Sequence, residues 1–184
     1  MTRRPARHGA AVVPVLVVVA LAGCGGGPGA SDPSSAPAPT RDADQAWTEY
    51  GALPQDLAAA LDDAVGDLGW TELQGPAVRQ GGDACALNLS RQRSEQVLLD
   101  LDDADLSATR AALDPVLAGY GFPALSEPTT DGGGQTVVES EHPDGGDVVL
   151  STRSDTVLDV GGIPLDPQGC EPGDVPAGGA DAGS

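Results

Sequence analysis

The chain has 184 residues, of which 28 are acidic and only nine are basic, so its formal net charge at neutral pH is −19. A surface this acidic repels the phosphates of nucleic acids and the anionic headgroups of membranes, which excludes nucleic-acid binding and membrane binding through a basic protein face. The length suits one domain of ordinary size.

The N-terminal residues follow one another as the parts of an export signal do. Arginines at positions 3, 4 and 7 precede an apolar run from Ala10 to Ala22, which closes in Leu21-Ala22-Gly23-Cys24. A single transmembrane anchor is the alternative, but a run of this length, rising about 1.5 Å per residue, falls short of a hydrocarbon core about 30 Å thick. The pattern predicts a signal peptide over residues 1–23 and a mature chain that begins at Cys24, whose thiol carries a diacylglycerol.

The segment Leu21-Ala22-Gly23-Cys24 resembles a bacterial lipobox. Together with the absence of lysine and the abundance of Ala, Gly, Val and Asp, it resembles the small cell-envelope lipoproteins of actinobacteria. The resemblance implies a lipid-anchored protein on the extracytoplasmic face of the cell membrane, in a family of unassigned activity, and implies no substrate. Without residues 1–23, six arginines against 28 acidic residues give a charge of −22, so the expected membrane contact is the lipid on Cys24.

The ends of the mature chain are poor in apolar residues. Residues 24–46 are rich in Gly, Pro, Ser and Ala, which predicts a disordered tether behind the lipid, and residues 171–184 predict a disordered tail. Residues 47–170 are expected to form a single domain. Trp47 and Tyr50 stand near the end of the tether and are expected to pack on that domain.

Two cysteines remain when Cys24 carries lipid. Cys85 and Cys170 form an even pair in an oxidising compartment, which favours a disulfide between them. Free thiols are one alternative. A metal site is another, but two sulfurs without a nearby histidine fall short of the four ligands that structural zinc prefers.

Helix and strand patterns predict an α+β fold with a duplicated unit. A gap-free shift of 52 residues places the pattern Gly-aromatic-x-x-Leu-x-x-Pro at Gly69 onto the same pattern at Gly121, which indicates repeat units at about 54–101 and 106–153. Each unit opens with an amphipathic helix, and the two stripes consist of Leu57, Leu61, Val65 and Leu68, and of Leu106, Leu113, Leu117 and Tyr120. The first helix is expected to stop at Gly69. The second, with Asp105 or Ser107 as its cap, is expected to stop at Gly121 and to bend at Pro115.

Three strands are expected after each helix. Alternating apolar and polar residues place them at about 71–79, 84–91 and 95–101 in the first unit and at 122–128, 135–141 and 147–153 in the second, with a last strand over 156–163. The predicted fold is an antiparallel sheet of about six or seven strands with two helices on one face, built as αβββ twice.

No catalytic, cofactor or metal motif is recognisable, so no residue is assigned to any of these roles. The single histidine of the mature chain, His142, precedes Pro143 in a turn and is expected to be an exposed loop residue. The densest carboxylate group is Asp100, Asp102, Asp103 and Asp105, whose spacing does not fit an EF-hand, which leaves a weak calcium site as an alternative to a solvated connection. Asp131 and Asp144 each open a glycine-rich turn.

Two classes of function follow. The favoured one is a non-enzymatic envelope protein, without cofactor, that binds a lipid, a glycan or a protein partner, or has a structural role. The alternative is an envelope-acting hydrolase that uses carboxylates as general acid and base. Two carboxylates facing each other across a concave cleft would favour the hydrolase, and an apolar groove would favour binding.

Overall fold

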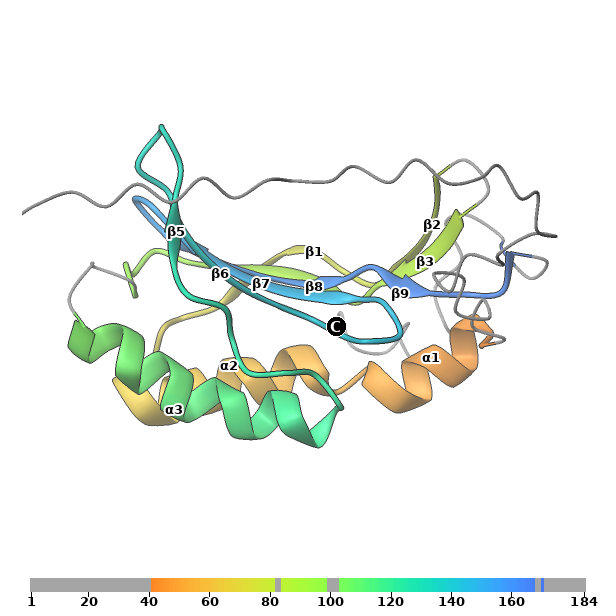
Figure 1. Cartoon of the computed structure of the whole chain (residues 1–184), viewed down its shortest axis with the longest axis horizontal. Helices are drawn as coiled ribbons and strands as arrows, with labels where there is room; N and C mark the ends of the chain where they lie inside the picture. Colours follow the sequence, from red (N-terminus) through yellow and green to blue (C-terminus); the bar gives the residue numbers. More distant parts are fainter. Residues whose placement is uncertain (1–40, 82–83, 99–102, 168–169, 171–184) are drawn as a thin grey trace, which may run out of the picture. The chain divides into compact units, whose positions relative to one another are not determined.

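The computed structural model describes residues 41–81, 84–98, 103–167 and Cys170. Three helices lie on one side of the chain's sheets: α1 (Ala43–Tyr50), α2 (Leu53–Val65) and α3 (Asp103–Gly119) (Figure 1). Helix α1 begins inside the segment predicted as tether, because Asp42 and Gln45 form a capping box in which each side chain binds the other's backbone N–H. The folded part of the chain therefore starts before Trp47.

The two longer helices are displaced from their predicted limits. Helix α2 has Pro54 in its first turn but ends at Val65, because Gly66 leaves the helix with φ +101°. Leu68 lies beyond the helix and is still buried, since its N–H donates to the Asp62 carboxylate. Helix α3 begins at Asp103, so Asp105 and Ser107 lie inside it and the prediction that they cap it is wrong.

The strands form an antiparallel sheet of six and a smaller one of three. The larger has the order β1-β4-β8-β7-β6-β5 and the smaller has the order β2-β3-β9. The bounds are β1 Thr71–Gln74, β2 Ala77–Gly81, β3 Ala84–Asn88, β4 Ser90–Ser94, β5 Thr129–Thr130, β6 Thr136–Glu141, β7 Asp147–Thr152, β8 Thr156–Gly161 and β9 Ile163–Pro164. The fold is α+β, as predicted.

The small sheet continues the large one. Strand β3 passes into β4 at Leu89 and β8 passes into β9 at Gly162, so the pair β4–β8 and the pair β3–β9 form one bent ribbon. Leu89 donates its N–H to the Val160 carbonyl at this bend. At the far end of the ribbon Cys85 is joined to Cys170 by a disulfide with Cα atoms 5.9 Å apart, and this is the pair that the sequence predicts.

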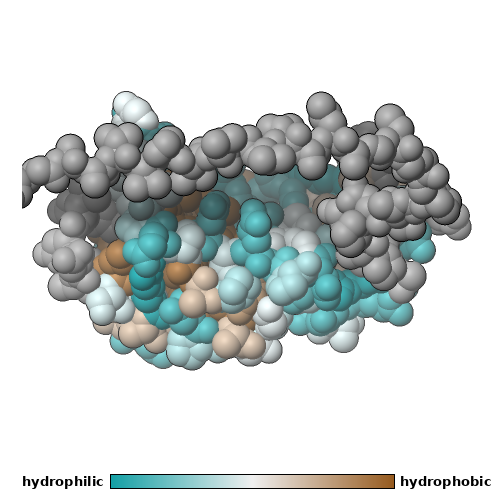
Figure 2. Space-filling view, viewed as in Figure 1, coloured by the Kyte–Doolittle hydropathy of each residue, from teal (hydrophilic) through white to brown (hydrophobic). Residues whose placement is uncertain are grey.

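A single core lies between the helices and the sheets. Alternate residues of the central strands are fully buried on the helix side, for example Val138, Leu150 and Leu158, and they meet Leu57, Leu61, Leu113 and Leu117 of the two long helices. Figure 2 shows hydrophobic residues mainly where the helical layer lies against the sheet, with hydrophilic residues over the remaining coloured surface of this side. The two-layer arrangement leaves the other face of the large sheet to a mixture of charged, polar and valine side chains.

The gap-free duplication holds for the helices and fails for the strands. Gly69 and Gly121 both have positive φ, +61° and +83°, and each precedes an aromatic residue that packs on the core. The equivalent leucines differ, because Leu73 is 52% exposed and Leu125 is 6% exposed. Residues 122–128 form no strand, since Pro123 and Pro128 have no N–H for a ladder. Residues 95–98 form none either, because Leu98 gives its N–H to the Thr156 hydroxyl.

Candidate binding surface

The face of the six-stranded sheet that points away from the helices is called the outer face here. Its side chains come from the strand positions that alternate with the core positions, and none of the helices among the described residues covers it (Figure 1). Its residues on the four central strands are Arg91 and Arg93 on β4, Val157 and Asp159 on β8, Asp147, Val149 and Ser151 on β7, and Val137, Glu139 and Glu141 on β6.

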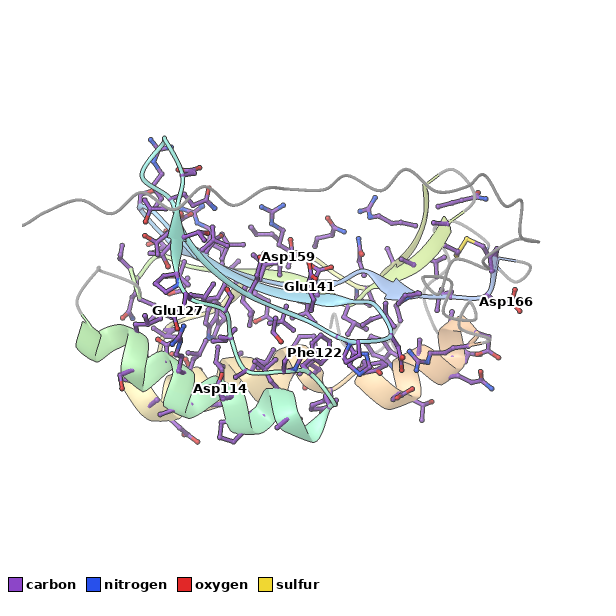
Figure 3. All side chains as sticks on the ribbon, viewed as in Figure 1. Asp114, Phe122, Glu127, Glu141, Asp159 and Asp166 are labelled. Atoms are coloured by element: carbon purple, nitrogen blue, oxygen red, sulfur yellow. A yellow bond between two sulfur atoms is a disulfide. The ribbon has the colours of Figure 1, made fainter. Side chains whose placement is uncertain are left out.

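Strand register arranges these side chains in rows across the sheet. Arg91 pairs with Asp159, Asp159 with Val149, and Val149 with Glu139, so these four residues stand side by side on one face. Figure 3 labels Asp159 on β8 and Glu141 on β6, the two strands on either side of β7. One end of the row is cationic and the other is anionic.

The anionic half of the outer face is crowded with negative charge. Glu141 lies directly opposite Asp147 on the neighbouring strand, and like charges in this position destabilise a sheet. Burial raises the pKa of the Asp147 carboxyl, and the negative charges of Asp159, Glu141 and Glu139 raise it further. This half of the outer face would therefore be stabilised by a positive group.

The cationic half consists of two arginines on β4. The Nε of Arg91 is 3.7 Å from the Asp159 carboxylate, and the Nε of Arg93 is 2.7 Å from the Asp155 carboxylate. Both arginine side chains remain about half exposed, at 52% and 46%. An exposed ion pair of this kind contributes little to stability. Each of these contacts involves Nε, and a guanidinium group has further N–H donors that can bind a partner.

An aromatic cluster fixes helix α1 to the rest of the domain. The ring of His142, in the turn between β6 and β7, lies 5.0 Å from the Phe122 ring and 5.9 Å from the Tyr50 ring, both in edge-to-face geometry. The His142 Nδ1 accepts the Asp144 N–H at 3.0 Å. His142 is therefore a half-buried packing residue of this cluster, and the prediction of an exposed loop residue is wrong.

The tyrosines of this cluster have elevated pKa values. Burial raises the pKa of Tyr120 to about 12, together with its hydrogen bond to the Asp56 carboxylate at 2.5 Å and the charge of that carboxylate. Burial also raises the pKa of Tyr50, and the positive charge of Arg41 offsets part of this rise. The Arg41 guanidinium lies over the Tyr50 ring, 5.2 Å from its centroid.

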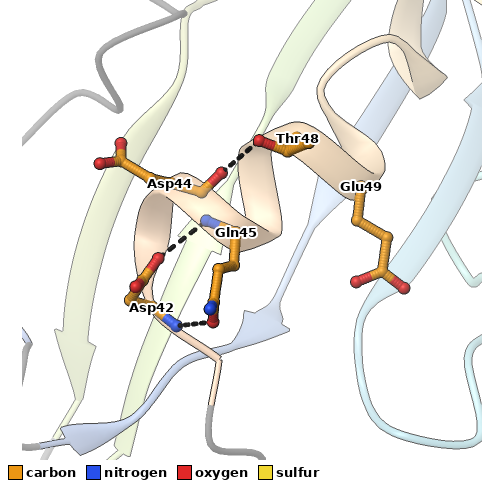
Figure 4. Close-up of a pocket in the computed structure, with 5 residues that line it drawn as sticks. All are labelled: Asp42, Asp44, Gln45, Thr48 and Glu49. Atoms are coloured by element: carbon orange, nitrogen blue, oxygen red, sulfur yellow. Dashed lines mark hydrogen bonds between the residues drawn. The ribbon is translucent and has the colours of Figure 1, made fainter.

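A shallow depression of 350 Å³ lies along α1 (Figure 4). Its lining contains three carboxylates, but Asp42 caps the helix and Glu49 pairs with Arg41 at 3.2 Å. The remaining lining residues are Asp44, Gln45 and Thr48, and the Thr48 hydroxyl donates to the Asp44 carbonyl. These groups hold the helix, and the depression offers no pair of carboxylates facing each other across a cleft as a glycan hydrolase would need.

The residues that the sequence singles out are dispersed. Cys24, Asp100 and Asp102 lie outside the described residues. Asp131 serves its turn, where its carboxylate accepts the N–H groups of Gly133 and Gln135 at 2.8 and 2.9 Å. Within the described part of the chain, no group of three or more His, Cys, Asp or Glu side chains is placed to hold a metal ion. The helices described there all lack the length and apolar composition of a membrane span.

Sequence reasoning missed the outer face. The alternation in Arg91–Arg93 and in Val137–Glu141 points charged residues outward, and that local signal is present in the sequence. The pairing of β4 with β8 joins residues 62 to 70 positions apart, from Ser94↔Thr156 to Ser90↔Val160, which the sequence pattern does not indicate. The charged row is therefore a product of topology.

A solved structure resembles part of this chain at low sequence identity. No family model matches the chain, and no curated protein matches it. The crystal structure of a DUF4853 family protein from Actinomyces odontolyticus aligns with 70% of this chain and 72% of that chain, at 15% sequence identity and a TM-score of 0.43.

Proposed function

We propose that this protein is an exported, lipid-anchored binding protein of the cell envelope, without enzymatic activity, and that the outer face is its binding surface. The disulfide between Cys85 and Cys170 is the observation that carries the proposed location. Structural disulfides persist in oxidising compartments outside the cytoplasm, which agrees with the signal peptide predicted over residues 1–23. Two independent features of the chain, the N-terminal signal pattern and the disulfide, thus favour the same location.

The arrangement of layers supports a binding role. The helices bury one face of the six-stranded sheet and leave the outer face with half-exposed arginines, exposed glutamates and half-buried valines in one plane. Polar and apolar groups mixed in this way are typical of protein interfaces that form and dissociate. A protein or another charged envelope component is therefore a better fit than a small apolar ligand.

The anchor is tested by Cys24→Ser, with Gly27→Ser in the tether as the matched control. We expect Cys24→Ser to prevent lipid transfer and signal removal, and Gly27→Ser to fractionate with membranes at the mature size as the parent protein does. Membrane association of Cys24→Ser at the mature size would contradict the lipid anchor.

The binding surface is tested by a photo-crosslinking amino acid at Val149, in the centre of the outer face. We expect covalent adducts in cells from position 149, and far fewer from the same amino acid at Asp63, which is exposed on α2. Equal adduct yields from the two positions would contradict a binding role for the outer face.

A further inference from the structure

The flanking strands β4 and β6 of the outer face carry opposite charges, whereas β8 and β7 between them carry Asp159 and Asp147. The strand order β1-β4-β8-β7-β6-β5 has three strands on each side of the boundary between β8 and β7. On one side β4 carries Arg91 and Arg93, and on the other side β6 carries Glu139 and Glu141. Strands β4 and β6 lie at equal distances from the boundary, since one strand separates each from it.

A surface divided in this way is complementary to itself. A two-fold axis roughly parallel to the strands, placed above the β8–β7 boundary, lays a second sheet face to face on the first. It brings β4 of each copy over β6 of the other and β8 over β7. Because a rotation about a strand-parallel axis keeps the position along the strands, residues of one row face residues of the same row.

One row then matches opposite charges. Arg91 and Glu139 belong to the same row, so Arg91 of each copy faces Glu139 of the other, and the contact occurs twice. Val149 of each copy then faces Asp159 of the other, whose carboxylate lies 3.7 Å from the Arg91 Nε of its own chain. We propose that the outer face binds a second copy of this chain about this axis, with Arg91 of each copy against Glu139 of the other. The proposal rests on the proposed function of the outer face.

Other occupants satisfy only half of the surface. An anionic ligand would neutralise the arginines and would be repelled by Glu139 and Glu141. A basic ligand would suit the glutamates and be repelled by the arginines. The net charge of each copy opposes association at long range, but salt screens that repulsion over about 8 Å at physiological ionic strength, whereas facing side chains interact at contact. A second copy is the occupant that presents an anion to Arg91 and a cation to Glu139 at the same time.

The experiment uses the full-length, membrane-anchored protein with the photo-crosslinker at Val149. We expect an adduct of twice the mature mass. Arg91→Glu alone and Glu139→Arg alone should each lower its yield by at least about tenfold, because each places like charges opposite one another twice. Asp63→Arg, an equal change of charge on α2, should leave the yield unchanged.

Co-expression of the two charge-reversed chains supplies the test that misfolding cannot imitate. The Arg91→Glu chain and the Glu139→Arg chain match each other, so the double-mass adduct should return and contain one copy of each. Failure of the mixture to restore the adduct, or an adduct equally strong in the single variants, would overturn the proposal. Adducts of other masses only would overturn the second copy and leave the binding surface intact, and no adducts at all would overturn both.

Discussion

Removal of the disulfide gives the most direct measure of what holds the C-terminal segment in place. The replacement Cys85→Ala with Cys170→Ala opens a loop whose ends are 85 positions apart. For a loop of this length the chain-entropy treatment assigns the crosslink about 4.6 kcal/mol, which is a large part of the roughly 5–15 kcal/mol of a typical domain.

The folded state has other contacts that hold this segment. The Leu165 N–H donates to the Cys85 carbonyl and the Asp166 N–H donates to the Arg41 carbonyl, each at 2.9 Å. Leu165 itself is 4% exposed. The folded structure should therefore persist without the sulfur bridge, and the loss of stability should arise mainly in the unfolded chain, which gains freedom.

Urea unfolding of the purified protein checks this account. We expect the free energy of unfolding to fall by about 3–5 kcal/mol and the m-value to rise, because an unfolded chain without the crosslink exposes more surface. Wild-type protein under reducing conditions is the matched control, since its sulfur atoms remain. A loss below about 1 kcal/mol with an unchanged m-value would refute the unfolded-state mechanism, and two free thiols in native peptide maps would refute the bridge itself.

Three further changes test the electrostatics and packing. Asp147→Asn should raise stability at neutral pH by about 0.2–1 kcal/mol, because it removes a negative charge from a crowded site. The gain should vanish in acid, where the wild-type carboxyl, whose pKa is raised, is protonated, and thermal melts across pH measure this dependence. Tyr120 has a pKa raised to about 12, so its titration should cost the fold stability as pH rises from about 10 to about 12, and Asp56→Asn should lower the pKa seen by tyrosinate absorbance. Gly121→Ala should destabilise by at least about 1–2 kcal/mol in urea unfolding, since the residue has φ +83° and its new Cβ would lie 2.8 Å from the His142 Nε2, whereas Gly119→Ala should have little effect.

Local patterns in the sequence are sufficient to predict which helix residues enter the core. Leu57, Leu61, Leu113 and Leu117 were predicted on the apolar stripes and are all fully buried. The limits of the helices were less predictable, because Gly66 ends α2 before the glycine that follows the stripe. Val65 was assigned to the stripe and is 41% exposed, since it is the last helical residue.

Contacts between distant segments account for what the sequence did not indicate. His142 stands in a turn sequence, yet it is packed by Tyr50 from α1 and by Phe122 beyond α3. Strand β8 was predicted as the last strand, but its place between β4 and β7 depends on hydrogen bonds with segments on both sides of α3. Periodicity predicts on which face of its own helix or strand a residue lies. It does not predict which other segment packs against that face.

The order of the large sheet also explains why a duplication was visible in the sequence although its register failed. The first strand after each long helix, β1 or β5, takes an outer edge, and the next strand of the same sheet, β4 or β6, lies inside it. The two inner strands are β8 and β7, both from the second half of the chain, because β2 and β3 of the first half belong to the small sheet. The sheet is thus symmetric in its order without being symmetric in its sequence, and its centre is the β8–β7 boundary. A second copy rotated about that boundary covers each strand with its counterpart, β1 over β5 and β4 over β6, so the proposed pairing leaves no central strand of either outer face uncovered.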